Sequence, residues 1–249
     1  MSGSPIVIKI GGHEIEDESF LQRLASVIRQ LEIPVIIVHG GGKEISTMQE
    51  KLGIQPHYVD GVRVTDAESL AVVTMILCGV INKRVVRIFN LAGLDAQGMS
   101  GVDRILISAV KMPHSTLDMG FTGEVVRVKA AVLHEMLATG VTPVIAPICH
   151  GDPSPYNVNA DHVAGAVAAA IGAERIVFIT NVEGVLVDNA VTPALTKVEA
   201  DKLIADGTIS GGMIPKVQTA LYALDGGVQR SVITNLVGLE TNGGTVFTK

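Results

Sequence analysis

The pattern of apolar and polar residues along the chain predicts strands that alternate with helices. Residues 5–10 and 35–38 are short runs rich in Ile and Val, which is typical of strands buried on both faces of a parallel sheet. Residues 17–32, 43–52 and 67–91 carry apolar side chains at helical spacing. Because strands joined by helices pair in parallel, this order predicts an α/β fold: an open, mainly parallel sheet covered by helices on both faces.

The pattern changes in the middle of the chain. Between residues 94 and 128, short alternating segments are separated by Gly and Pro, which predicts hairpins at a sheet edge. The alternation of strands and helices then resumes. We expect helices at residues 130–137, 161–171, 198–205 and 212–224, and strands at 142–148, 174–180, 230–234 and 244–248. We place the boundary between two lobes near Gly172, so that residues 1–172 form one lobe and 173–249 the other.

Composition narrows the classes of function. The chain has 249 residues, of which 47% are hydrophobic and 18% charged, as in ordinary globular proteins. A net charge of -6, no Trp and 3% aromatic residues argue against nucleic-acid binding, which needs basic surfaces and stacking side chains. Apolar runs are too short to predict a membrane span, and two cysteines without a secretory signal favour the cytoplasm. A small-molecule partner is therefore expected.

Glycines follow the first two predicted strands. Gly11 and Gly12 follow the first strand, and the sequence His-Gly-Gly-Gly at residues 39–42 follows the second. Backbone N–H groups at the start of a helix form a site for anionic oxygen, so phosphate is the expected ligand. The alternative is a tight turn with close packing, and a single histidine such as His39 is more often a hydrogen-bonded core residue. The usual P-loop and dinucleotide-binding motifs are absent from the sequence.

Three ionisable residues occupy unusual positions. Lys9 lies within an apolar strand, where an ammonium group is costly unless it has a partner. Lys216 and Asp161 each lie near the start of a predicted helix, and we interpret Asp161 as a counter-ion shared by both lysines. Taken singly, each residue has a plainer explanation: a strand-end lysine reaching solvent, an exposed helix lysine and a helix N-cap.

Five motifs together resemble one protein family. They are KIGG (residues 9–12), VHGGG (38–42), GVRVTD (61–66), YNVNAD (156–161) and GGMIPKV (211–217). In this order and spacing, over nearly the whole chain, they resemble the amino acid kinase family, and within it most closely the branch that acts on N-acetyl-L-glutamate. The resemblance implies two lobes with a central cleft, in which residues 1–172 bind substrate and form a dimer surface and residues 173–249 bind nucleotide.

The same resemblance implies a reaction. The γ-phosphoryl group of ATP would pass to the side-chain carboxylate of N-acetyl-L-glutamate, giving N-acetyl-L-glutamyl 5-phosphate in arginine biosynthesis. Lys9 and Lys216 would compensate charge on the phosphoryl group, and Asp161 would hold both amines. Mg²⁺ would bridge the phosphates, although the sequence assigns no protein ligand to it.

The resemblance also implies binding residues. For the phosphoryl group they are Gly11 and Gly12, and for the substrate they are Gly41, Gly42, Arg63, Asn157 and Asn159. For the nucleotide they are Thr180, Asn181, Val182, Gly184, Val185, Thr208, Ile209 and Ser210. Arg63 would hold the α-carboxylate of the substrate through its planar guanidinium group. Asn181 departs from the Asp that is common at this position in the family, which weakens the transfer of roles there.

Three other functions stay open at this point. One is a related kinase that phosphorylates aminoadipate linked to a carrier protein in lysine biosynthesis, which Asn181 slightly favours. The second is a non-catalytic regulator that binds an amino acid on the same fold, and the third is a nucleotide-dependent oxidoreductase. Arginine-inhibited members resemble one another in a helical extension before the first strand, whereas here that strand starts near Pro5. We therefore expect a homodimer without arginine feedback.

Overall fold

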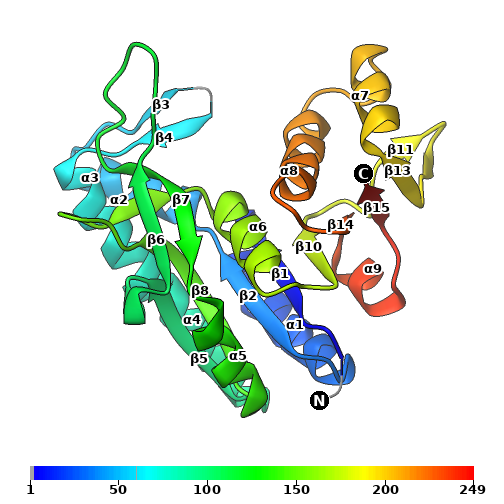
Figure 1. Ribbon diagram of the computed structural model, residues 1–249, viewed down its shortest axis with the longest axis horizontal. Helices are drawn as coiled ribbons and strands as arrows, with labels where there is room; N and C mark the ends of the chain where they lie inside the picture. Colours follow the sequence, from blue (N-terminus) through cyan, green and yellow to red (C-terminus); the bar gives the residue numbers. More distant parts are fainter. Residues whose placement is uncertain (1–2, 60) are drawn as a thin grey trace.

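A single large sheet forms the centre of the protein. The computed structural model describes residues 3–59 and 61–249, and in this part of the chain eleven strands join in one sheet. Ten of them follow the order β13-β15-β14-β10-β1-β2-β8-β9-β7-β6, and β5 pairs with β8 (Figure 1). The strands of this sheet are β1 (Ile6–Ile10), β2 (Val35–His39), β5 (Ala96–Gly101), β6 (Ile107–Lys111), β7 (Thr122–Val128), β8 (Thr142–Cys149), β9 (Tyr156–Val158), β10 (Arg175–Ile179), β13 (Ala194–Thr196), β14 (Ser231–Thr234) and β15 (Thr245–Thr248).

The middle of the sheet is parallel, as the sequence predicts. In β1, Lys9 pairs with Val38 of β2 on one side and with Phe178 of β10 on the other, and both pairings are parallel. Antiparallel pairs occur nearer the edges, between β14 and β15 and between β6 and β7. Because three parallel strands end together, the loops that follow β1, β2 and β10 meet at one edge of the sheet.

Helices cover both faces of the sheet, which confirms the predicted fold class. On one face the core joins the sheet to α1, the long helix at residues 67–91 and α9; on the other it joins the sheet to α5, α6 and α8. α7 and α8 pack together over β14 and β15. The α-helices are α1 (Glu18–Gln30), α2 (Gly42–Lys51), α3 (Ala67–Thr74), α4 (Asn82–Leu91), α5 (Ala130–Ala138), α6 (Ala160–Ala170), α7 (Lys197–Ala205), α8 (Met213–Asp225) and α9 (Leu236–Thr241).

The long helix predicted at residues 67–91 contains a π-helical segment, Met75–Ile81, between α3 and α4. By length and composition this is the one helix of the described residues that is apolar enough to cross a membrane, and half of its most apolar window is buried. A core helix of a soluble protein passes the same test. Short 3₁₀ turns lie at Gly12–Ile15 and Asp103–Ile105.

The region at residues 94–128 is only partly the edge hairpin that its sequence suggests. β6 and β7 form an antiparallel hairpin as predicted, but β5 pairs in parallel with β8. β5 has the sequence AQGMSG, which lacks β-branched residues. It lies so close to α4 that a side chain at Gly98 would come within 2.0 Å of the Asn82 amide oxygen. Two small ribbons were not predicted: β3 (His57–Val59) with β4 (Val62–Val64), and β11 (Leu186–Val187) with β12 (Ala190–Val191).

Candidate active site

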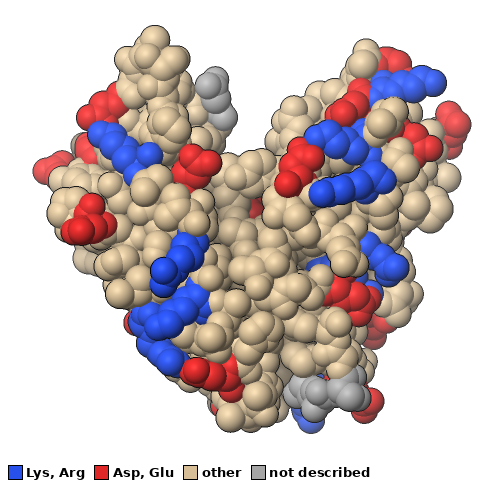
Figure 2. Space-filling model, viewed as in Figure 1, with Lys and Arg blue, Asp and Glu red and all other residues tan. Residues whose placement is uncertain are grey.

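A cleft of about 520 Å³ opens where β1 and β10 end. In the space-filling view the surface is hollowed between the part of the molecule around β3 and β4 and the part around α7 and α8 (Figure 2). The described residues that line the cleft are Lys9, Gly11, Gly12, Glu14, Asp161, Phe178, Ile179, Thr180, Asn181, Pro215, Lys216, Thr219 and Ile233. All three ionisable residues singled out in the sequence therefore lie in one cavity.

Lys9 and Asp161 form an ion pair in this cleft. The Lys9 ammonium nitrogen lies 2.8 Å from a carboxylate oxygen of Asp161, and the two side chains are 20% and 24% exposed. Asp161 lies in the first turn of α6, which Asn159 caps by accepting a hydrogen bond of 2.8 Å from the Asp161 backbone N–H. Asn159 is thus the N-cap, and Asp161 has its carboxylate available for Lys9.

Lys216 lies apart from this pair. It lies in the first turn of α8, and it lines the same cleft. Within the described residues, no hydrogen bond or ion pair joins Lys216 to Asp161. Of the two predicted contacts of Asp161, the structure therefore shows the one with Lys9 and not the one with Lys216.

The glycines after β2 are explained in different ways. A side chain at Gly41 would come within 2.2 Å of the terminal methyl group of Ile81 at the end of the π-helical segment, so packing favours glycine there. Gly42 begins α2, and a side chain built on it would meet nothing within 4 Å. The protein's own packing leaves the space beside Gly42 open, which is what the approach of a ligand to the helix N-terminus needs.

His39 lies beneath this turn as a neutral, buried residue. Its Nδ1 lies 3.0 Å from the Gly40 carbonyl oxygen, and the Asn82 side-chain amide lies 3.1 Å from Nε2. Asn82 also donates a hydrogen bond of 2.9 Å to the Val144 carbonyl. These contacts fit an imidazole that donates from Nδ1 and accepts at Nε2. Burial lowers the pKa of His39 to about 4, so the ring is a structural support for the glycine turn.

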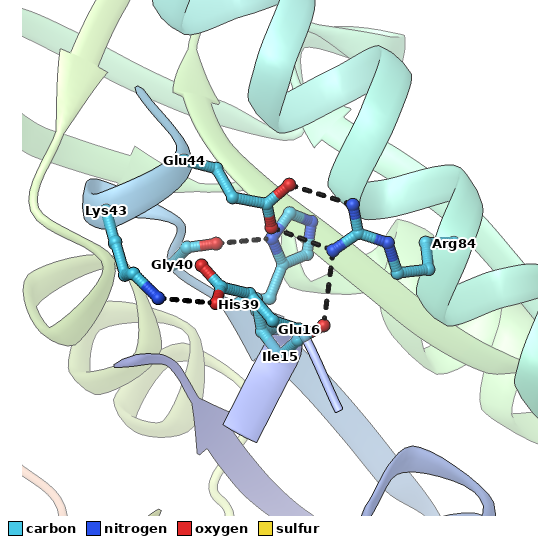
Figure 3. A network of polar contacts seen from close by, with 7 residues as sticks. All are labelled: Ile15, Glu16, His39, Gly40, Lys43, Glu44 and Arg84. Atoms are coloured by element: carbon cyan, nitrogen blue, oxygen red, sulfur yellow. Dashed lines mark hydrogen bonds and ion pairs between the residues drawn. The ribbon is translucent and has the colours of Figure 1, made fainter. Parts of the chain in front are cut away.

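A second group of polar contacts holds the start of α2 against its neighbours (Figure 3). The Arg84 guanidinium donates two hydrogen bonds of 2.8 Å to Glu44 and a longer one of 3.4 Å to the Ile15 carbonyl. Lys43 pairs with Glu16 at 2.7 Å. Because Glu44 is in α2, Arg84 in α4 and Ile15 in the turn after β1, this network fixes both glycine turns relative to each other.

A second cavity of about 190 Å³ lies beside Gly42. It brings together the five predicted substrate-binding residues, namely Gly41, Gly42, Arg63, Asn157 and Asn159. Arg63 is 9% exposed, and burial lowers the pKa of its guanidinium. The Asn157 amide donates a hydrogen bond of 3.0 Å to the Thr65 hydroxyl. Arg63 is therefore a buried part of the pocket wall and not a solvent-exposed side chain.

Apart from Gly42, the residues that hold Arg63 were not singled out in the sequence. Arg63 donates hydrogen bonds to the Ser46 hydroxyl at 2.9 Å, to the Gly42 carbonyl at 3.2 Å, and to the side chains of Gln49 and Tyr58. The sequence gives no signal for this role of Ser46 and Gln49, since α2 meets Arg63 only through the tertiary fold, whereas Tyr58 is the cross-strand neighbour of Arg63 in the β3–β4 ribbon.

The predicted nucleotide-binding residues gather in two cavities. Thr180 and Asn181 line the cleft. A further cavity of about 370 Å³ contains Val182, Gly184, Val185, Thr208, Ile209 and Ser210. Residues 182–185 and 208–210, which are more than 20 residues apart in the sequence, thus line one pocket. This is the arrangement expected if both segments bind the same ligand. No group of three potential metal ligands from His, Cys, Asp and Glu occurs in the described part of the chain.

Known proteins resemble this chain along nearly its whole length. A sequence model of the Amino acid kinase family matches residues 4–235. The chain is 52% identical to a protein named acetylglutamate kinase from Roseiflexus castenholzii over 238 residues, which are 96% of this chain and 92% of that protein. It is 48% identical to a protein of the same name from Chloroflexus aurantiacus over 97% of this chain and 96% of that protein. A crystal structure from Streptococcus mutans has a TM-score of 0.82 and 29% identity, and covers 98% of each chain.

Proposed function

Because the chain belongs to the amino acid kinase family, we propose that it transfers the γ-phosphoryl group of ATP to the side-chain carboxylate of N-acetyl-L-glutamate. The product is N-acetyl-L-glutamyl 5-phosphate, an acyl phosphate of arginine biosynthesis. Relatives named acetylglutamate kinase, about half identical over nearly their full length, support this substrate over carrier-linked aminoadipate and over a regulator without activity.

One observation carries the proposal: the Lys9–Asp161 ion pair and Lys216 line one cleft. A carboxylate with an ordinary pKa of about 4.3 is ionised at neutral pH and needs no general base to act as nucleophile. The reaction does need compensation of negative charge where the carboxylate and the phosphoryl group meet. Lys9 and Lys216 provide this charge, and Gly11 and Gly12 provide backbone N–H groups at the same edge of the sheet.

The substrate and the nucleotide would approach the cleft from different cavities. Arg63 holds the α-carboxylate of N-acetyl-L-glutamate, aided by Asn157, while Gly41, Gly42 and Asn159 line its pocket. ATP occupies the cavity formed by residues 182–185 and 208–210 and extends its phosphates past Thr180 and Asn181.

Mg²⁺ fits this site as an ion held mainly by phosphate. Of the described residues that line the cleft, Glu14 and Asp161 carry carboxylates. Mg²⁺ commonly binds one or two carboxylates together with substrate phosphates, so this donor set is sufficient. When bound, the ion would neutralise charge on the β- and γ-phosphates. Glu14 is the carboxylate available for it, since Asp161 already pairs with Lys9.

We place substrate binding in residues 1–172 and nucleotide binding in residues 173–249. A homodimer in the cytoplasm is part of the same proposal. The helix at residues 67–91 is the expected dimer surface, because it exposes the apolar side chains of Met75, Val80 and Leu91. Analytical ultracentrifugation tests this part, and a monomer at micromolar concentration would contradict it.

Initial rates of ADP release test the activity. With MgATP, we expect release that depends on N-acetyl-L-glutamate and is far slower with L-glutamate or without an acid. Trapping with hydroxylamine should yield the hydroxamate of the acyl phosphate. Faster turnover of carrier-linked aminoadipate, or ADP release that is independent of any acid, would refute the proposal.

A further inference from the structure

Gln49 is a buried amide directly behind Arg63. It lies near the end of α2, and its exposed fraction is 0%. Glutamine is seldom fully buried, and a buried amide is costly unless its oxygen and nitrogen both have partners. Both do here: Oε1 accepts a hydrogen bond from Arg63 Nη1, and Nε2 donates one of 2.9 Å to the Ser69 hydroxyl.

The hydrogen bonds continue in one direction from Arg63 to Asp66. The Ser69 hydroxyl accepts from Gln49. The Ser69 backbone N–H donates to the Asp66 carboxylate at 2.8 Å, and hydrogen bonding from Ser69 lowers the pKa of Asp66. Because each donor faces an acceptor, the chain fixes the orientation of the Gln49 amide with its oxygen on Arg63.

The acceptors around Arg63 are uncharged. They are the Gln49 amide oxygen, the Gly42 carbonyl and the hydroxyls of Ser46 and Tyr58. Within residues 3–59 and 61–249, no carboxylate forms an ion pair with Arg63. Neutral acceptors orient a buried guanidinium group while leaving its charge uncompensated. A carboxylate at the position of Gln49 would neutralise that charge before any ligand arrived.

We propose that Gln49 is a positioning residue that aims Arg63 into the pocket through a neutral acceptor and so reserves the guanidinium charge for a carboxylate of the substrate. This inference rests on the proposed function. It assigns to Gln49 a role in affinity for the acid, and not in the chemical step, because Arg63 lies in the cavity beside the cleft while Lys9 and Lys216 lie in the cleft itself.

The decisive variant is Gln49→Glu. Glutamate has the length of glutamine and keeps an oxygen acceptor for Arg63, but it adds a negative charge. We expect KM for N-acetyl-L-glutamate to rise at least about tenfold at saturating MgATP, with kcat within about twofold of the wild-type value. Gln22→Glu adds the same charge at an exposed position of α1 and should leave both constants unchanged. If the only role of Gln49 were to fill space or to link α2 to β4, Gln49→Glu would keep the wild-type KM for N-acetyl-L-glutamate. That result would overturn the inference.

A second variant covers a failure to fold. Gln49→Met has a similar length but replaces the amide oxygen with a thioether, which is only a weak acceptor, and it should raise KM severalfold with unchanged kcat; far-UV circular dichroism and the thermal midpoint establish folding. If Gln49→Glu does not fold, an unchanged KM in Gln49→Met overturns the inference. The proposed function fails separately: in that case the wild-type enzyme itself releases no ADP in response to N-acetyl-L-glutamate.

Discussion

Asp161→Asn keeps the shape of Asp161 and removes its charge, which isolates what the carboxylate does for Lys9. The two groups are 2.8 Å apart and only partly exposed. Unit charges at about 4 Å interact by about 4 kcal/mol at an effective dielectric constant of about 20. Because solvent reaches both side chains, we take about half of this value, roughly 2 kcal/mol. If that energy holds the Lys9 amine at the phosphoryl group, kcat should fall about 30-fold with little change in KM.

Double-mutant cycles make this prediction specific. Lys9→Ala removes the amine and should lower kcat by about 10²–10³-fold. In that background Asp161→Asn should cost almost nothing more, since no amine remains to be held. Lys216→Ala is the matched control. Asp161 does not contact Lys216 in the described structure, so the asparagine substitution should there retain its full effect.

Steady-state rates of ADP release at saturating MgATP and N-acetyl-L-glutamate measure all of these variants. Equal loss of kcat on Asp161→Asn in the wild-type and Lys9→Ala backgrounds would refute a role of Asp161 through Lys9. This role is also refuted if the strong coupling appears with Lys216, because the carboxylate would then serve the other lysine during turnover.

Three further predictions concern the pocket and its support. Arg63→Lys keeps the charge but loses the planar fork, so KM for the acid should rise about tenfold, and a fall in kcat alone would contradict its assigned role. Gly42→Ala should raise KM for the acid without changing the thermal midpoint. Gly41→Ala, whose new side chain clashes with Ile81, should lower the free energy of unfolding by about 1–3 kcal/mol. Equal thermal midpoints of the two variants would contradict this difference in packing. Burial keeps the pKa of His39 near 4, so between about pH 6.5 and 4 the unfolded chain binds a proton that the folded chain does not. The free energy of unfolding should therefore fall by up to about 3 kcal/mol as the pH decreases through this range. Urea unfolding at pH 7 and 4.5 measures the fall, which His39→Asn should reduce; the same pH dependence in both proteins would exclude His39 as its source.

The central fold was predictable because its signals are local. β1, β2 and β10 are short β-branched runs, and the helices between them have apolar residues at helical spacing. β5 was misplaced for a physical reason: its glycines suit close contact with α4, so its sequence resembles a loop more than a buried strand. The π-helical segment also escaped prediction, since its apolar composition fits an ordinary helix.

The site was predictable where motifs carry it and not where tertiary contacts do. The pairing of Lys9 with Asp161 was expected because an ammonium in an apolar strand needs a counter-ion. The burial of Gln49 and Ser69 could not be predicted from the sequence, because single polar residues in helices are ordinarily exposed. Their burial follows only once α2 and α3 pack together. That Lys216 stands away from Asp161 likewise depends on where α8 is placed, which no local pattern specifies.

The parallel pairing of β1 with β10 restricts how the two sides of the cleft can move against each other. Four residue pairs, from Ile6 with Arg175 to Lys9 with Phe178, join the two sides through backbone hydrogen bonds. A hinge needs a few residues whose dihedral angles absorb a rotation, and a paired ladder provides none without breaking those bonds. A rotation of one side against the other would therefore have to twist this ladder or break its backbone hydrogen bonds.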